Sequence, residues 1–230
     1  MENRVTLQSK SEPIGTVTET FDQGQFADET MLFSADPNYA SFHGGPITKA
    51  VLNYLDQFYL DEKNSHKAHS PKFPVPIIDT RVHMLMPGMF PAIPGWHLDH
   101  TPRNAHNGQP VPEKADEDQK SIVVILATDP NVSRCEYLHA PYGLDIPYDP
   151  ERVWGSINEY IENAREGLSL LSPPESQIIL LSGQCLHRAT ACKVRGWRYF
   201  LRLSWFPQET KPQNKIRRQV QVYTTEQTGW

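Results

Sequence analysis

Short apolar runs and alternating stretches dominate the second half of the chain. Residues 77–86, 121–128, 133–139, 177–182 and 197–206 are rich in β-branched and aromatic side chains, and Gly, Pro, Asn or Asp residues bound most of them. Many short strands separated by turn residues predict a mainly β fold. They favour a jelly-roll or cupin-like barrel over an alternating α/β sheet.

Two other segments have helical periodicity. Residues 46–60 place apolar side chains along one stripe, and Pro46 suits the first turn of a helix. Residues 151–168 repeat the pattern, with Gly167 near the end. We therefore expect two α-helices that support the barrel.

The remaining segments are mostly polar. Residues 1–40 carry scattered β-type side chains and predict one or two strands that extend the main sheet, or an arm over the site. Residues 61–76 predict a surface loop, and residues 101–120 a long mobile loop, a type of segment that often forms a lid or binds a ligand. We expect this loop, the N-terminal arm and a loop at 140–150 to build the substrate pocket. One more alternating run lies at 214–223.

The length of the chain, 230 residues, is enough for one domain with a sizeable core. We expect a single domain, 1–230, whose barrel core covers about 77–206. An N-terminal extension, 1–76, and a C-terminal tail, 207–230, would flank this core.

Charge and cysteine content narrow the class of protein. A net charge of −5 gives no electrostatic footprint for duplex nucleic acid, although Lys215, Arg217 and Arg218 form a small basic cluster. Three cysteines are too few for a disulfide framework and indicate a reducing compartment. The sequence has no apolar stretch of membrane-spanning length and no secretory signal at its start. We expect a cytoplasmic protein without a membrane partner.

The residues with metal-binding chemistry centre on the segment 91–103. His97 and Asp99 are two positions apart, so on an extended strand their side chains project to the same face. The preceding Pro94 and Gly95 mark a bend. A third candidate, His187, follows an apolar run far downstream. Two imidazoles and one carboxylate can hold a non-haem ferrous ion on one side and leave its other side open.

A His-x-Asp pair alone is a weak signal in a chain with nine histidines, and the context strengthens it. The strand predicted after His187 carries Arg198 and Arg202, which share a face because they are four positions apart. In this order of elements the sequence resembles the Fe(II)- and 2-oxoglutarate-dependent oxygenases. The resemblance covers about 77–206 and points to no subfamily. It implies a double-stranded β-helix with the metal inside the mouth of the barrel.

The resemblance also implies a reaction and its cofactors. His97, Asp99 and His187 would bind Fe(II), and 2-oxoglutarate and dioxygen would take the open positions. The enzyme would oxidise a C–H bond, by expectation through hydroxylation, and would release succinate and CO2.

The distal carboxylate of 2-oxoglutarate needs a cation, and a guanidinium fork binds both of its oxygens. Arg198, eleven positions after His187, is the first choice. Arg202 is a rival or a second contact, and Ser204 on the same face could donate to the same carboxylate.

Plainer interpretations stand beside these. His97 and Asp99 could be a hydrogen-bonded surface pair, and His187 a core histidine. The two arginines could be edge-strand charges. On a strand, His100 would point away from the metal pair, so we leave it out of the site.

The roles of other residues near the motif have two interpretations each. Cys185 is two positions before His187, so on a strand it would project to the same face and could face the metal. A cysteine in a strand is more often a small buried hydrophobe. His83 is expected to be structural, with a role as an alternative ligand left open. Trp96 and Arg103 could touch substrate, and aromatic packing explains Trp96 equally well.

Two other functions remain open at this point. One is a cupin-type metalloenzyme that does not use 2-oxoglutarate, and the other is a non-catalytic jelly-roll binding module. For the oxygenase we expect a small-molecule or amino-acid-like substrate. Oligomeric state is left open by the sequence.

Overall fold

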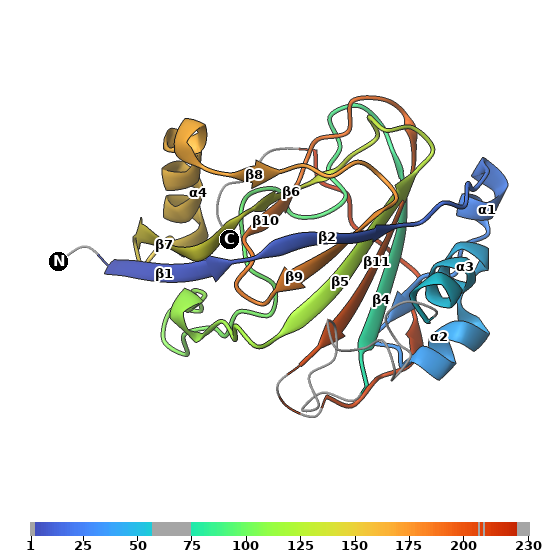
Figure 1. The fold of residues 1–230 in the computed structure, drawn as a ribbon, viewed down its shortest axis with the longest axis horizontal. Coiled ribbons are helices and arrows are strands. Elements are labelled where there is room, and N and C mark those ends of the chain that lie inside the picture. Colours follow the sequence, from blue (N-terminus) through green and yellow to red (C-terminus); the bar gives the residue numbers. More distant parts are fainter. Residues whose placement is uncertain (1–2, 57–74, 207, 209, 225–230) are drawn as a thin grey trace.

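The largest sheet is antiparallel and has five strands in the order β2-β9-β5-β11-β4 (Figure 1). The computed structural model describes residues 3–56, 75–206, 208 and 210–224, and these are mainly β. The strands of this sheet are β2 (Ser11–Thr16), β9 (Gln177–Ser182), β5 (Lys120–Ala127), β11 (Gly196–Trp205) and β4 (Ile77–Leu85).

A smaller sheet has the order β10-β6-β8. Its strands are β10 (His187–Ala189), β6 (Cys135–Leu138) and β8 (Leu170–Leu171). His97 joins the outer edge of β10 through an isolated bridge to His187. Two further antiparallel pairs are β1 (Asn3–Ser9) with β7 (Ala140–Tyr148), and β12 (Lys215–Ile216) with β3 (Leu32–Phe33).

Period-two alternation separates the two faces of the large sheet. On β11, Tyr199, Leu201 and Leu203 belong to the same buried cluster as the apolar stripe of a nearby helix. The intervening positions, among them Arg198 and Arg202, line a pocket on the opposite face. One strand therefore supplies both the core and the site.

Helices cover one face of the large sheet. Figure 1 shows α1 (Gln23–Ala27), α2 (Pro37–His43) and α3 (Pro46–Leu55) grouped together beside it, while α4 (Val153–Asn163) lies at the other end of the molecule. Two 3-10 turns, Pro112–Lys114 and Arg165–Gly167, complete the helical elements of the described residues. Among those residues, no helix combines the length and the apolar character needed to cross a bilayer.

The main strands and the second helix lie where the apolar pattern predicts them, with ends shifted by one or a few residues. The helix predicted at 46–60 is present as α3, and its last four positions, 57–60, lie outside the described residues. The predicted loop 61–76 lies almost entirely outside them as well. The N-terminal segment extends the large sheet through β2, as expected.

Two segments differ from expectation. Residues 140–150 are not a loop, because β1 supplies the hydrogen-bonding partner that makes Ala140–Tyr148 a strand. Within 101–120, an Arg103–Pro110 bridge and a 3-10 turn replace the predicted unstructured loop. The alternating run 214–223 forms only the short β12 and a single bridge, Phe90–Tyr223.

Helix α3 begins after a glycine pair that permits close packing. A Cβ on Gly45 would lie 2.6 Å from Oε2 of Glu29. The Glu29 carboxylate accepts hydrogen bonds from the backbone N–H groups of Gly45 (3.1 Å) and Ile47 (2.7 Å), and from the Thr48 hydroxyl (2.5 Å). Burial raises the pKa of Glu29. A distant side chain therefore caps a helix whose own N-cap residue is glycine.

We expect Glu29→Ala to lower the free energy of unfolding by about 2 to 3 kcal/mol, because it leaves buried N–H donors without an acceptor. Glu29→Gln keeps one acceptor oxygen and should cost less. Urea denaturation of both variants measures the difference. An alanine variant as stable as the parent protein would show that the carboxylate is not the cap.

Candidate metal centre

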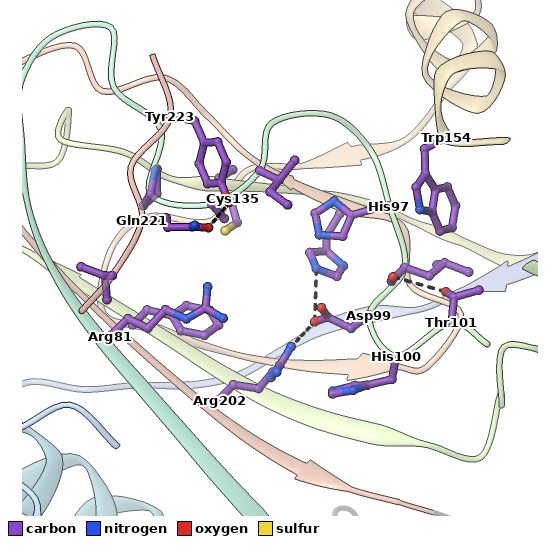
Figure 2. Close-up of a pocket in the computed structure, with 18 of the residues that line it drawn as sticks. Arg81, His97, Asp99, His100, Thr101, Cys135, Trp154, Arg202, Gln221 and Tyr223 are labelled. Carbon is purple, nitrogen blue, oxygen red and sulfur yellow. Dashed lines mark hydrogen bonds and ion pairs between the residues drawn. The ribbon is translucent and has the colours of Figure 1, made fainter. Parts of the chain in front are cut away.

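His97 and His187 are brought together by their own backbones. The N–H of each residue donates to the carbonyl of the other, at 3.1 Å in both directions. Their rings consequently lie with centroids 4.7 Å apart. One ligand atom from each histidine and one from Asp99 lie within 4.8 Å of one another (Figure 2). The structure thus brings together the three residues that the sequence singles out.

Both imidazoles are oriented in the same way. Nδ1 of His97 lies 2.8 Å from the carbonyl oxygen of Gly95, and Nδ1 of His187 lies 2.9 Å from that of Cys185. A carbonyl only accepts, so each Nδ1 carries the proton in these contacts and the lone pair of the neutral ring is on Nε2. A backbone acceptor on the opposite nitrogen is the usual support of a metal-ligating histidine.

Gly95 supplies the first of these carbonyls at a bend. Its φ of +98° lies in a region that favours glycine, which agrees with the bend expected from the sequence. The turn aims the carbonyl back at the ring of the residue two positions later.

The pKa values of His97 and Asp99 suit a cation, because they favour a neutral imidazole and an ionised carboxylate. Burial, together with the neighbouring His187, lowers the pKa of His97 to about 4. Burial opposes ionisation of Asp99, yet Arg202 and His187 hold the pKa of its carboxyl well below the usual range. Burial also disfavours the charged form of His187, but Asp99 outweighs it and raises the pKa.

The donor set fits a divalent transition metal. Asp99 is an anionic oxygen donor beside two imidazole nitrogens, and Nε2 of His187 lies 3.4 Å from its Oδ2. Such a set, with positions left open, is typical of non-haem Fe(II) sites.

Asp99 does not lie on a strand, contrary to expectation. His97 makes a single bridge and Asp99 is in a turn, followed by His100 with a φ of +56°. Asp99 is held instead by an ion pair with Arg202, which also lies 3.5 Å from Asp79. Because the turn ends the strand alternation, His100 also lines the pocket (Figure 2), although it is not part of the ligand cluster found among the described residues.

A buried asparagine of α4 clamps the residue before His97. The Asn158 side chain accepts from the Trp96 N–H (2.6 Å) and donates to the Trp96 carbonyl (2.9 Å). Trp96 itself is fully buried, donates through Nε1 to Glu162 and packs under Arg188. Packing therefore accounts for Trp96, and Asn158 is a supporting residue that the sequence pattern did not reveal.

The three candidate ligands line a cavity of about 1030 Å³. Arg198 and Arg202 both line it, with Phe200 between them on β11. Arg198 is only 3% exposed. Its Nε lies 3.3 Å from the Ser133 carbonyl and its Nη2 lies 3.5 Å from Sγ of Cys135. Among the described residues no carboxylate pairs with Arg198, whereas Arg202 is paired with two.

Other candidates lie away from the cavity wall. Ser204 is buried and shares a hydrogen bond with Ser121 at 2.9 Å. Cys185 is a buried member of an apolar cluster, and all three cysteines are free. His83 is buried beside Arg198 in the β4–β11 register, and burial lowers its pKa to about 3. None of these three is part of the ligand cluster found among the described residues.

The C-terminal tail forms part of the cavity wall, which the sequence did not predict. The alternating run at 214–223 was the available signal. Of the three segments expected to build the pocket, 101–120 contributes Thr101, Arg103 and Pro110, while the N-terminal arm and 140–150 do not contribute. The tail residues that line the cavity are Arg217, Gln219, Val220, Gln221 and Tyr223.

No protein-family profile matches the sequence, and no curated protein matches it. Solved structures with some similarity include an N-substituted L-amino acid dioxygenase from Burkholderia ambifaria AMMD in complex with alpha-KG. It is 17% identical with a TM-score of 0.33, over 54% of this chain and 46% of that one. Another is EctD from S. alaskensis, 12% identical with a TM-score of 0.37, over 88% and 84%.

The chain spans about half the length of the Burkholderia enzyme.

We expect Asn158→Ala to weaken divalent metal binding about 10- to 100-fold, the range typical of residues that support metal ligands. Calorimetric titration with Mn(II), well below the unfolding temperature, measures this. Glu162→Gln is the matched control, because it also contacts Trp96 but only through the indole ring. Equal metal affinity in the alanine variant and the parent protein would contradict a positioning role for Asn158.

Proposed function

We propose that this protein is a non-haem Fe(II)- and 2-oxoglutarate-dependent oxygenase that hydroxylates a C–H bond and releases succinate and CO2. One observation carries the proposal: His97, Asp99 and His187 converge in a cavity that also contains a buried arginine, Arg198, for which the described residues provide no carboxylate partner. Bound iron, with 2-oxoglutarate and dioxygen, would supply the oxidising chemistry. The residues of the chain bind and orient these groups.

His97, Asp99 and His187 would be the metal ligands. The carboxylate offsets part of the charge of the cation, and the two Nε2 atoms are pre-aimed by backbone carbonyls. Arg202 keeps Asp99 ionised and oriented through their ion pair. We therefore give Arg202 a positioning role in place of direct contact with 2-oxoglutarate.

Arg198 would bind the distal carboxylate of 2-oxoglutarate. A buried cation with only neutral partners is costly, and a carboxylate ligand relieves this cost through two charge-assisted hydrogen bonds. Arg202 already has two carboxylate partners, so it lacks this requirement. Ser204 is turned to Ser121 and would not contact the cosubstrate.

We further propose that the two sheets are the two halves of a double-stranded β-helix within one domain. The metal site lies where His97 joins the small sheet, and Arg198 lies on the large sheet. Three free, buried cysteines suit a reducing compartment, and we assign the protein to the cytoplasm.

Anaerobic reconstitution with Fe(II) and 2-oxoglutarate tests the function. The proposal predicts a weak visible charge-transfer band and, on admission of oxygen, slow succinate formation without added substrate. His187→Ala should lose both signals, while His106→Ala, a change at an exposed loop histidine, should keep them. Metal binding without either signal would favour a cupin-type enzyme that does not use 2-oxoglutarate. Absence of metal binding would favour a binding module.

Arg198→Ala should raise the 2-oxoglutarate concentration needed for half-saturation by about 10- to 100-fold, because it removes a charge-assisted contact. Fe(II) affinity should stay nearly unchanged, since no ligand is lost. Titration of the visible band with 2-oxoglutarate gives the first value, and titration with metal alone gives the second. Arg202→Ala is the matched variant on the same face. If only this variant raised the 2-oxoglutarate requirement, the assignment of Arg198 would be wrong.

A further inference from the structure

The cavity carries more positive charge than 2-oxoglutarate requires. Five arginines line it, and among the described residues its lining includes one carboxylate, Asp99. Asp79 lies next to it, paired with two of the arginines. The charges of a ferrous dication and a 2-oxoglutarate dianion would cancel. Asp99 and Asp79 offset two of the five arginines, so three positive charges remain without a counterion. The five arginines are Arg81, Arg103, Arg198, Arg202 and Arg217.

Arg81 differs from the other four in its partners. Arg103 donates to the Gly108 carbonyl, and Arg217 lies 3.6 Å from Asp79 and stacks on Phe33. Arg202 is paired with carboxylates, and Arg198 is assigned above to the cosubstrate. For Arg81, the structure shows no hydrogen bond or ion pair with any described residue, and its Nε is buried without a partner.

Its position on β4 points Arg81 into the cavity. It lies opposite Phe200 in the β4–β11 register, between the positions of Asp79 and His83 on the same face. Burial lowers its pKa, the nearby Arg202 and Arg217 also lower it, and Asp79 and Asp99 offset this only in part. A guanidinium held among other cations in a partly dry site is stabilised by an anionic ligand.

The C-terminal tail places polar groups on the same side of the cavity. Figure 2 shows Gln221 and Tyr223 on the side of Arg81, across from Thr101 and Trp154. The Tyr223 hydroxyl donates to Oε1 of Gln221 at 2.8 Å, which leaves the amide N–H group of that glutamine as a donor. Reciprocal backbone bonds between Tyr223 and Phe90, at 3.0 and 2.7 Å, fix this part of the tail.

We propose that Arg81, aided by the Gln221 amide, binds an oxyanionic group of the substrate, so that the substrate is a small anionic molecule with a carboxylate or phosphate. The inference rests on the proposed function and adds the substrate class to it. The cavity, about 1030 Å³, is at the top of the range for a single drug-sized ligand and has room for the cosubstrate and a second small molecule. A guanidinium fork suits both types of oxyanion.

The test uses the full chain, loaded anaerobically with Fe(II) and saturating 2-oxoglutarate, whose visible band reports that both remain bound. Benzoate and inorganic phosphate are titrated by calorimetry, with benzamide as the neutral analogue of benzoate. We expect at least one anion to bind with one-to-one stoichiometry and benzamide to bind at least about tenfold more weakly. Arg81→Gln should weaken anion binding by about tenfold or more and leave Fe(II) and 2-oxoglutarate affinities unchanged.

Arg81→Lys keeps the charge without the fork and should give an intermediate anion affinity, which separates a charge effect from misfolding. The inference is overturned if neither anion binds, if benzamide binds as well as benzoate, or if Arg81→Gln leaves anion binding unchanged. It is also overturned if Arg81→Gln mainly weakens 2-oxoglutarate, because Arg81 would then serve the cosubstrate. Loss of the visible band in the parent protein would instead reject the proposed function itself.

Discussion

The reciprocal backbone hydrogen bonds between His97 and His187 are the constraint on which the site depends. They join two segments that are far apart in the sequence, and they add His97 to the edge of the small sheet. Directly opposed residues of an antiparallel pair lie about 5 Å apart and place their side chains on the same face. Two imidazoles are therefore close before any metal binds. Asp99 then needs only a short turn to reach them.

Alternate positions along the strands of the large sheet face either the hydrophobic core or the pocket. The positions of β11 that face α1–α3 are apolar and fully buried, whereas the intervening positions carry Arg198 and Arg202. Asp79 on β4 pairs with Arg202 and with Arg217 of the tail, so one carboxylate links the sheet, the tail and, through Arg202, the candidate ligand Asp99. The packing of the apolar face thus holds in place the opposite face, which forms a pocket wall with more arginines than carboxylates.

The sequence was sufficient to predict the main strands and the three candidate ligands, because short-range periodicity and residue chemistry determine both. It could not show that 140–148 is a strand, since that depends on pairing with β1 near the start of the chain. The place of His100 depends on a positive φ that alternation does not anticipate. Asn158 and the tail residues reach the site only through tertiary contacts, and local pattern carries no information on those.

Anomalous diffraction from crystals grown anaerobically with Fe(II) tests the central claim most directly. Data collected on both sides of the iron absorption edge locate the ion without reference to activity. The account predicts one iron peak about 2.0 to 2.2 Å from Nε2 of His97, Nε2 of His187 and a carboxylate oxygen of Asp99, the distances usual for transition-metal ligands of these types. An iron peak bound by a different set of residues, or no peak between these three side chains, would contradict it.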